Sequence, residues 1–302
     1  MTDISRWPII KQEFDDAGDY HGDKYLRLCL HVLLYYEGLF ADTADDIVCF
    51  YQTGMPYIRD RVRYYGVDGN FRLKGVEVST FDMLPFWAQS IDDERLLYGL
   101  VLESGVSKQD RSDRAFHLYQ RGTVSPGFVR LILPIETVAD GADDFVELVH
   151  ALVGHIPVIY GNAGFALSYY GGGYAERVLA LSRRYRGVDM AEPYDFRSYV
   201  TEGIPSAHWI TILGERFMKS FEGGVASLVG PDVTVTEATH ATIIQAGPMP
   251  SFGEVNRRDT LPLVHQVGRA LARVRIPETA LGEYNGIGDG PNTLEWLARF
   301  DP

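Results

Sequence analysis

The amino-acid sequence predicts an α+β fold with a largely antiparallel sheet and helices packed on one side of it. Short apolar runs bounded by turn residues predict strands, and other segments place apolar side chains at helical spacing. The two kinds of segment are mixed, without the regular strand–helix alternation of a parallel sheet. Apolar residues make up 46% of the 302 residues and charged residues 23%, which suffices for a sizeable core. Each half also has a strand, a helix and a later hairpin, so the order is compatible with an internal duplication, although no sequence repeat demonstrates it.

The first half is predicted to hold most of the strands. Residues 25–36 are rich in Leu and aromatic side chains and favour a central strand, with a helix as the alternative for so short an apolar run. Residues 42–51 begin with acidic side chains, which stabilise a helix N-terminus through the helix dipole. Residues 143–153 have apolar side chains at helical spacing. The further predicted strands are 71–78, 96–103, 115–121 and 128–137.

The second half continues with a mixture of both kinds of element. Residues 158–170 predict a strand with a glycine bend, and residues 174–186 predict a helix with a basic C-terminal end. Residues 206–221 predict a helix with Ser206 as its N-cap. A hairpin at 233–237 and 241–246 and a final helix at 261–274 complete the predicted elements.

The predicted domain organisation is a single body with two flanking segments. We expect an acidic N-terminal segment at residues 1–24, one α+β domain at residues 25–276, and a C-terminal extension at residues 277–302. No proline-rich or serine-rich linker marks a boundary within the central part, so we expect one domain there rather than two.

The charge balance indicates the kind of partner. The net charge is -13, and the first 50 residues contain ten acidic but only four basic side chains. Such a protein repels phosphate backbones, which argues against direct binding of nucleic acid, whereas a basic protein is attracted. Acidity that serves only solubility is the alternative interpretation. The candidate partner-binding residues are Asp15, Asp16, Asp19, Asp42, Asp45 and Asp46.

Several features predict a cytoplasmic location. The N-terminus lacks the apolar core of a secretory signal, and no stretch of eighteen apolar residues predicts a membrane span. Cys29 and Cys49 are too few for a disulfide framework, and their apolar neighbours predict buried, reduced thiols.

The search for catalytic, cofactor or metal motifs finds none, so we predict that the chain is not an enzyme. His150 and His155 lie five residues apart and do not form the HExxH arrangement of a zinc helix. Neither a GxSxG elbow nor a Walker loop is present, and the three glycines at 171–173 are interpreted as a turn because no lysine follows them. An enzyme whose metal site combines distant residues remains the alternative, with Asp144 and Glu147 beside these histidines as the candidate cluster.

Two segments resemble a known family. One is GIPSAHWITILG at residues 203–214, and the other is IQAGPMPSFGEVN at residues 244–256. Together they resemble the TsiV family (DUF3396), immunity proteins of type VI secretion that act against VRR-Nuc toxins, and the resemblance spans about residues 25–276. His208 departs from the family pattern, which usually has Asn before the Trp. The motif residues are Gly203, Trp209, Leu213, Gly214, Gln245, Gly247, Pro248, Pro250, Gly253 and Asn256.

The resemblance implies an immunity protein and a nuclease toxin as its partner. Such a toxin is a nuclease of the PD-(D/E)xK type that uses a divalent metal to cut DNA, and the antidote is expected in the cytoplasm with it. We expect inhibition by occlusion of the DNA-binding cleft, with the aspartates on the contact surface and the motif residues holding the fold. An adaptor protein of the secretion apparatus is a further alternative.

Overall fold

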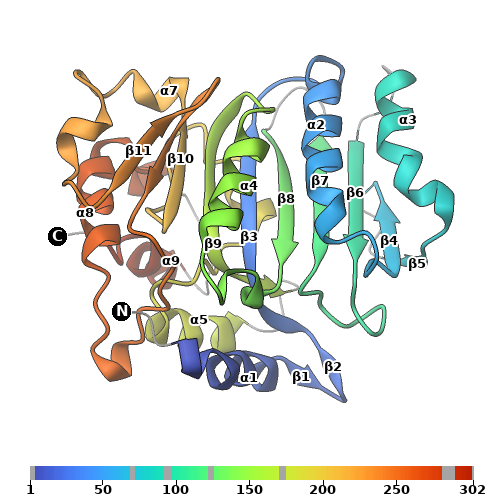
Figure 1. Ribbon diagram of the computed structural model, residues 1–302, viewed down its shortest axis with the longest axis horizontal. Coiled ribbons are helices and arrows are strands. Elements are labelled where there is room, and N and C mark those ends of the chain that lie inside the picture. The colour runs from blue at the N-terminus through green and yellow to red at the C-terminus, as the bar shows by residue number, and fades with distance from the viewer. Residues whose placement is uncertain are drawn as a thin grey trace.

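In the part of the chain that the structure describes, one ten-stranded antiparallel sheet forms the centre of the molecule. The computed structural model describes residues 4–68, 72–91, 95, 97–121, 126–169, 175–280 and 290–300, so the glycines at 171–173 lie outside the described residues. The strand order is β11-β12-β10-β9-β3-β8-β7-β6-β4-β5, and every pair is antiparallel (Figure 1). The predicted α+β class with an antiparallel sheet is therefore confirmed.

Two long strands form the centre of the sheet. β3 (Leu26–Tyr36) pairs with β9 (Val158–Tyr169) along nearly its whole length, and almost every side chain of both strands is buried. Because both faces of these strands are covered, they appear in the sequence as continuous apolar runs rather than as alternating ones. The other strands of the sheet are β4 (Tyr64–Val67), β5 (Lys74–Gly75), β6 (Leu97–Glu103), β7 (Ala115–Arg121), β8 (Gly127–Leu133), β10 (Ile210–Gly214), β11 (Thr234–Glu237) and β12 (Ala241–Gln245).

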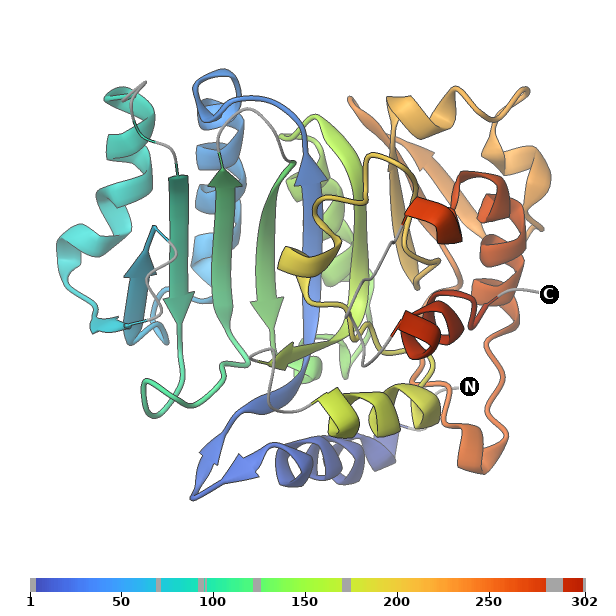
Figure 2. The ribbon, with the colours of Figure 1, turned by 180° about the vertical axis from the view of Figure 1, so that it is seen from behind.

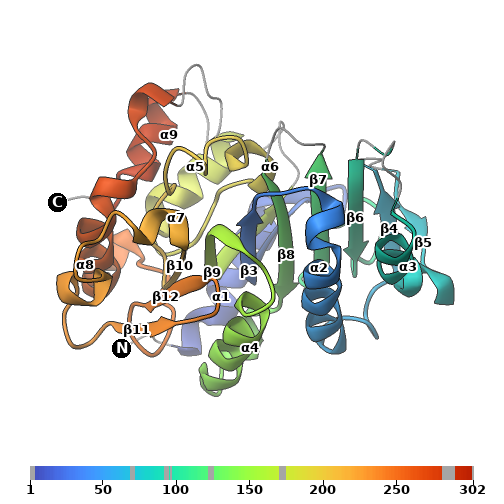
Figure 3. The same cartoon turned by 90° about the horizontal axis from the view of Figure 1, so that it is seen from above.

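Helices cover the sheet on both faces. α2 (Phe40–Gly54), α3 (Met83–Gln89) and α4 (Asp143–Val153) lie along one face, whereas α5 (Ala175–Arg184) and α9 (Gly290–Leu297) lie on the other (Figure 3). The sequence predicted helices on one side, and the structure adds this second cover behind the half of the sheet that contains β9 and β10. Figure 2 shows the added helices from behind. The remaining elements are α1 (Trp7–Ala17), the hairpin β1 (Asp19–Tyr20) and β2 (Asp23–Lys24), and the helices α6 (Pro193–Phe196), α7 (Glu215–Met218) and α8 (Pro262–Leu271).

Both flanking segments contribute to the same hydrophobic core as the central strands. In α1, Trp7, Ile10 and Phe14 repeat at helical spacing and are buried, and the Trp7 ring packs edge-on against Phe165 of β9. Near the C-terminus, Trp296 is also part of this core. Domain boundaries near residues 25 and 276 stay a prediction.

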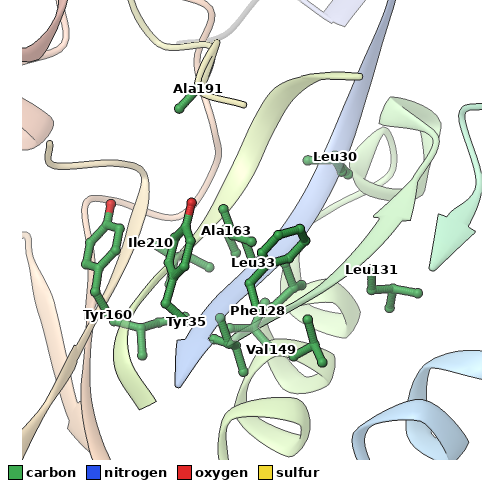
Figure 4. Close-up of a cluster of buried hydrophobic side chains, with 14 of the residues drawn as sticks. Leu30, Leu33, Tyr35, Phe128, Leu131, Val149, Tyr160, Ala163, Ala191 and Ile210 are labelled. Carbon is green, nitrogen blue, oxygen red and sulfur yellow. The ribbon is translucent and has the colours of Figure 1, made fainter. Parts of the chain in front are cut away.

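The tyrosines at the centre of the sheet hold loops as well as filling space. The rings of Tyr35 and Tyr160 are stacked with centroids 6.2 Å apart, and Figure 4 shows both hydroxyl groups pointing the same way. The Tyr35 hydroxyl donates to the carbonyl of Pro193 at 3.2 Å, and that of Tyr160 donates to the carbonyl of Ser206 at 3.1 Å. Each buried hydroxyl therefore fixes a segment that crosses the back of the sheet.

The helix predicted at residues 206–221 is wrong. Its middle is strand β10, which lies between β9 and β12, and only α7 (Glu215–Met218) is helical. A short apolar run that is buried on both faces lacks the periodicity that distinguishes a strand from a helix. Its conformation is therefore determined by pairing with the neighbouring strands. The prediction that both thiols are buried is also half wrong, because Cys29 is buried but Cys49 is exposed on α2.

Candidate interaction surface

The six candidate aspartates do not lie on one surface. Asp15 and Asp16 belong to α1 and Asp19 to β1, near the start of β3, whereas Asp42, Asp45 and Asp46 belong to α2, which begins beyond the other end of β3 (Figure 1). β3 has 11 residues, and a strand advances about 3.3 Å per residue, so roughly 35 Å separates its two ends. The two groups therefore belong to different surfaces.

The aspartates near α1 are largely engaged by neighbouring groups. Asp19 pairs with Lys24 at 2.6 Å, and this hydrogen bond lowers the pKa of Asp19. Asp15 is 3.8 Å from Arg27, but its partial burial raises the pKa of Asp15. Asp16 accepts a hydrogen bond from Gln12 at 2.6 Å. Cations neutralise much of this group, so it contributes less to attraction at long range.

The aspartates of α2 belong to a larger acidic surface that we call the acidic helix layer, defined as α2, α3 and α4. α2 contacts both other helices. Asp42 and Asp45 are exposed on α2, and α4 adds exposed acidic side chains, namely Asp143, Asp144 and Glu147. These three helices contain neither Lys nor Arg. The layer therefore presents negative charge with no cation on its own helices, while Arg95 lies over the Trp87 ring of α3 at 4.1 Å.

Apolar side chains project beside this charge. Phe86 of α3 is 63% exposed, and Val78, in the turn that precedes α3, is 82% exposed. Large apolar groups with this exposure next to charged groups are typical of protein–protein contact surfaces. The layer thus combines groups suited to long-range attraction with groups suited to tight packing.

The alternative metal cluster is not assembled. Asp144 and Glu147 are exposed on α4, whereas the His155 ring, beyond the end of that helix, lies 3.2 Å from the Thr53 hydroxyl. Among the residues that the structure describes, no group of three or more His, Cys, Asp or Glu side chains is placed to hold a metal ion.

Sequence reasoning missed a buried polar network on the back of the sheet. Arg130 of β8 donates from Nε to Nδ1 of His31 at 3.1 Å, and Nε2 of His31 donates to Oδ1 of Asn162. The Asn162 amide donates to Asp189 at 3.2 Å. All four side chains are at most 3% exposed. The signal in the sequence was polar residues within strands that are otherwise apolar, in β8, β3 and β9.

This network resembles a catalytic arrangement, but both ring nitrogens of His31 already form hydrogen bonds within it. Because Nδ1 of His31 accepts from a guanidinium, Nε2 must carry the proton, and no lone pair is left to act as a base. Burial, together with the nearby Arg130, lowers the pKa of His31 to about 3. The imidazole is therefore neutral at physiological pH and joins three neighbouring strands.

A second buried group continues these interactions along the sheet. Glu103 of β6 lies 2.9 Å from the Arg111 guanidinium and 3.0 Å from Nε2 of His117. Burial alone would raise the pKa of Glu103, but Arg111 and His117 outweigh it and lower the pKa to about 2. The buried carboxylate is thus ionised and paired, as burial of a charge requires.

The first family motif is built into the sheet. The indole of Trp209 is buried and donates to the carbonyl of Gly247 at 2.9 Å, which joins the two motifs directly. Leu213 is buried within β10, and Gly214 ends that strand. A Cβ on Gly214 would lie 1.8 Å from the carbonyl oxygen of Val158, and one on Gly203 would lie 2.4 Å from the backbone of Arg275. Both glycines are therefore required by the close approach of another backbone segment.

The second motif forms the loop after β12. Gly247 and Gly253 have φ angles of +89° and +60°, which favour glycine, and Gln245 donates to the carbonyl of Gly247 at 3.0 Å. Pro248 lines a small cavity of about 150 Å³ together with Trp209. Pro250 is buried within the loop, and Asn256 is exposed in the turn that follows it. The structural role expected for the motif residues stays a prediction.

Together, the fold and the surface define an antiparallel α+β protein with a broad acidic helical face. The TsiV family, described as type VI immunity for VRR-NUC, matches residues 84–300, more than half of the chain. The chain therefore belongs to the TsiV family, which confirms the resemblance seen in the motifs. The match extends beyond residue 276 and so includes the C-terminal helix α9.

A solved structure shares this fold. The Pseudomonas aeruginosa T6SS protein PA0821 is similar with a TM-score of 0.78 over 93% of this chain and 83% of that chain, at 15% sequence identity. At this identity the similarity shows the fold alone. No curated protein matches the chain. Among the described residues, no helix combines the length and apolar character needed to cross a membrane.

Proposed function

We propose that this protein binds the VRR-Nuc nuclease of a type VI secretion system and inhibits it by covering its DNA-binding cleft. Family membership supports the immunity role, and the acidic helix layer supports this mode of inhibition. A cleft that binds DNA must present cationic groups to the phosphates. The layer offers carboxylates, with no Lys or Arg of its own, to those same groups.

Charge and apolar contacts have separate tasks in this proposal. Exposed ion pairs contribute only about 0–1 kcal/mol each, so charge mainly accelerates encounter. Tight inhibition at nanomolar affinity requires about -12 kcal/mol, over a typical interface of roughly 1,600 Å². Phe86 and Val78 are the exposed apolar groups that supply part of the packing and so slow dissociation.

The proposal also gives a location and a stoichiometry. The nuclease attacks DNA, so we place the complex in the cytoplasm. The protein acts without chemistry of its own, as one inhibitor bound to one toxin. Inhibition in a nuclease assay should then be complete near an equimolar ratio and should not continue to increase with incubation time.

Reversal of three charges in α2 tests the contact surface. We expect the variant Asp42→Lys/Asp45→Lys/Asp46→Lys to inhibit the toxin at least about tenfold more weakly, because cationic side chains would face a cationic cleft. The measurement is the inhibitor concentration that halves DNA cleavage by the purified toxin.

A matched variant separates position from total charge. Glu222, Asp232 and Glu278 are exposed acidic residues outside the layer. Their replacement by lysine changes the net charge by the same amount, and we expect inhibition to stay near that of the wild type. Equal loss in both variants would show that total charge matters and not the layer, whereas full inhibition by the α2 variant would remove this face from the proposal. Circular dichroism checks that both variants are folded.

A further inference from the structure

A cavity of about 430 Å³ lies far from the acidic helix layer, between the end of α5, the loop after β12 and the start of α8. Three arginines from separate segments line it. Arg186 follows α5, Arg258 follows the 3₁₀ turn Val255–Arg257, and Arg269 lies in α8. Figure 3 shows α5 and α8 at the same end of the molecule.

These arginines have no evident role within the protein. In the described part of the chain, their three guanidinium groups form neither hydrogen bonds nor ion pairs with protein atoms. By contrast, the nearby Arg184 pairs with the buried Glu254 at 2.8 Å. All three arginines are exposed, and the carboxylate of Asp259 also lines the cavity, so the lining keeps an excess of positive charge that attracts an anion.

The backbone around the cavity supports the same conclusion. Arg258 has a φ of +61°, a left-handed conformation that costs free energy for any residue with a Cβ and that tends to persist at functional sites. Leu261 and Pro262 also line the cavity, at the start of α8. No side chain caps this helix, so the positive end of its dipole lies at this part of the lining, whereas Arg269 belongs to its last turn.

We propose that this cavity is a binding site for a small phosphate-type anion. Guanidinium groups match the oxygens of a phosphate in pairs, and three of them surround the space. A neighbouring space of about 510 Å³ shares Arg186 and His265 with the cavity, which leaves room for a second phosphoryl group. The net charge of -13 disfavours a long polyanion such as DNA.

Calorimetric titration of the purified full chain with inorganic phosphate and with pyrophosphate tests this site. We expect saturable binding, with pyrophosphate bound more tightly because it reaches the second space. Arg186→Gln or Arg269→Gln should each weaken binding about tenfold or more, because each removes a charge-assisted hydrogen bond. The control is Arg216→Gln, since Arg216 is exposed on α7 with only Glu37 near it, at 3.9 Å. This control should bind as the wild type does.

These binding measurements do not involve the toxin, so they test the anion site independently of the proposed immunity function. Absence of saturable binding up to about 10 mM, an affinity too weak to matter in a cell, would overturn the proposal. So would an equal loss in the Arg216 variant. Tighter binding of a short DNA duplex than of pyrophosphate, with the same dependence on Arg186, would replace the small anion by nucleic acid. Thermal unfolding without ligand confirms that each variant is folded.

Discussion

At the scale of single residues, the buried imidazoles couple folding to pH. His31 and His208 are almost fully buried, and burial lowers their pKa values to about 3 and about 4 from 6.5. In the unfolded chain, both take up a proton near pH 6.5, whereas the folded protein keeps them neutral. Between these values the unfolded state holds the extra protons, so the free energy of unfolding falls as pH falls below 6.5. Glu192 has the opposite effect on stability, because burial raises its pKa to about 7. As pH falls, the folded state takes up a proton at Glu192 before the unfolded state does, and this raises the free energy of unfolding.

The substitution His208→Gln isolates one of these contributions. Glutamine does not titrate, so the free energy of unfolding of the variant should fall less steeply between pH 6.5 and pH 4. The expected difference in slope is about 1.4 kcal/mol per pH unit. Urea unfolding at a series of pH values measures it. Parallel pH profiles for the two proteins would show that His208 is not held neutral in the fold.

At the scale of elements, β10 shows how a close backbone contact restricts one position. The strand is buried throughout, between β9 and β12, and it ends at Gly214 where the carbonyl oxygen of Val158 occupies the place of a side chain. No rotamer relieves a contact between Cβ and backbone, so the strands themselves would have to separate. The glycine is thus a condition for the pairing of β9 with β10.

Substitution of this glycine should be costly, and substitution of another strand glycine should not. We expect Gly214→Ala to lower the free energy of unfolding by about 3 kcal/mol or more. Gly75, in the edge strand β5, has open space around it, so Gly75→Ala should change stability by less than about 0.5 kcal/mol. Urea unfolding measures the free energy of unfolding of both variants. A similar small effect at the two positions would contradict the steric argument.

At the scale of the whole molecule, charge is distributed unevenly. The acidic helix layer carries negative charge on one face of the sheet, whereas unpaired arginines surround the cavity between α5 and α8. Such a separation orients the protein as it approaches a charged partner. The acidic face would be turned toward a cationic partner.

The rate of association with the toxin should therefore depend strongly on salt. Raising the salt from about 0.05 M to about 0.5 M shortens the screening length several-fold and should lower the association rate on the order of tenfold. The dissociation rate should change much less, because buried apolar contacts set it. Stopped-flow fluorescence measures both rates. An association rate that is insensitive to salt would refute electrostatic attraction.

Much of the fold could be predicted from local patterns. The apolar run at 25–36 and the helical spacing at 143–153 correspond to β3 and α4, and the strand predicted at 115–121 is β7, whereas only Lys74–Gly75 of the strand predicted at 71–78 is a strand. The predictions failed where local pattern is ambiguous, as in β10, or where it is weak, as in α1 and α3. The two motifs were enough to indicate the family, because their glycines allow close backbone contacts in this fold and Trp209 forms a hydrogen bond between the motifs.

The sequence by itself therefore determined the class of fold, the family and the acidity of the chain. Only the tertiary structure decided which charges act together. The aspartates of the first 50 residues are close in sequence, yet β3 separates them into a group near α1, where Asp15 and Asp19 lie beside cations, and a group on α2, where Asp42 and Asp45 are exposed. The arginines around the cavity, in contrast, are up to 83 residues apart and meet in space. The physical reason is that electrostatic interactions depend on distance and burial, and both are set by packing rather than by order along the chain.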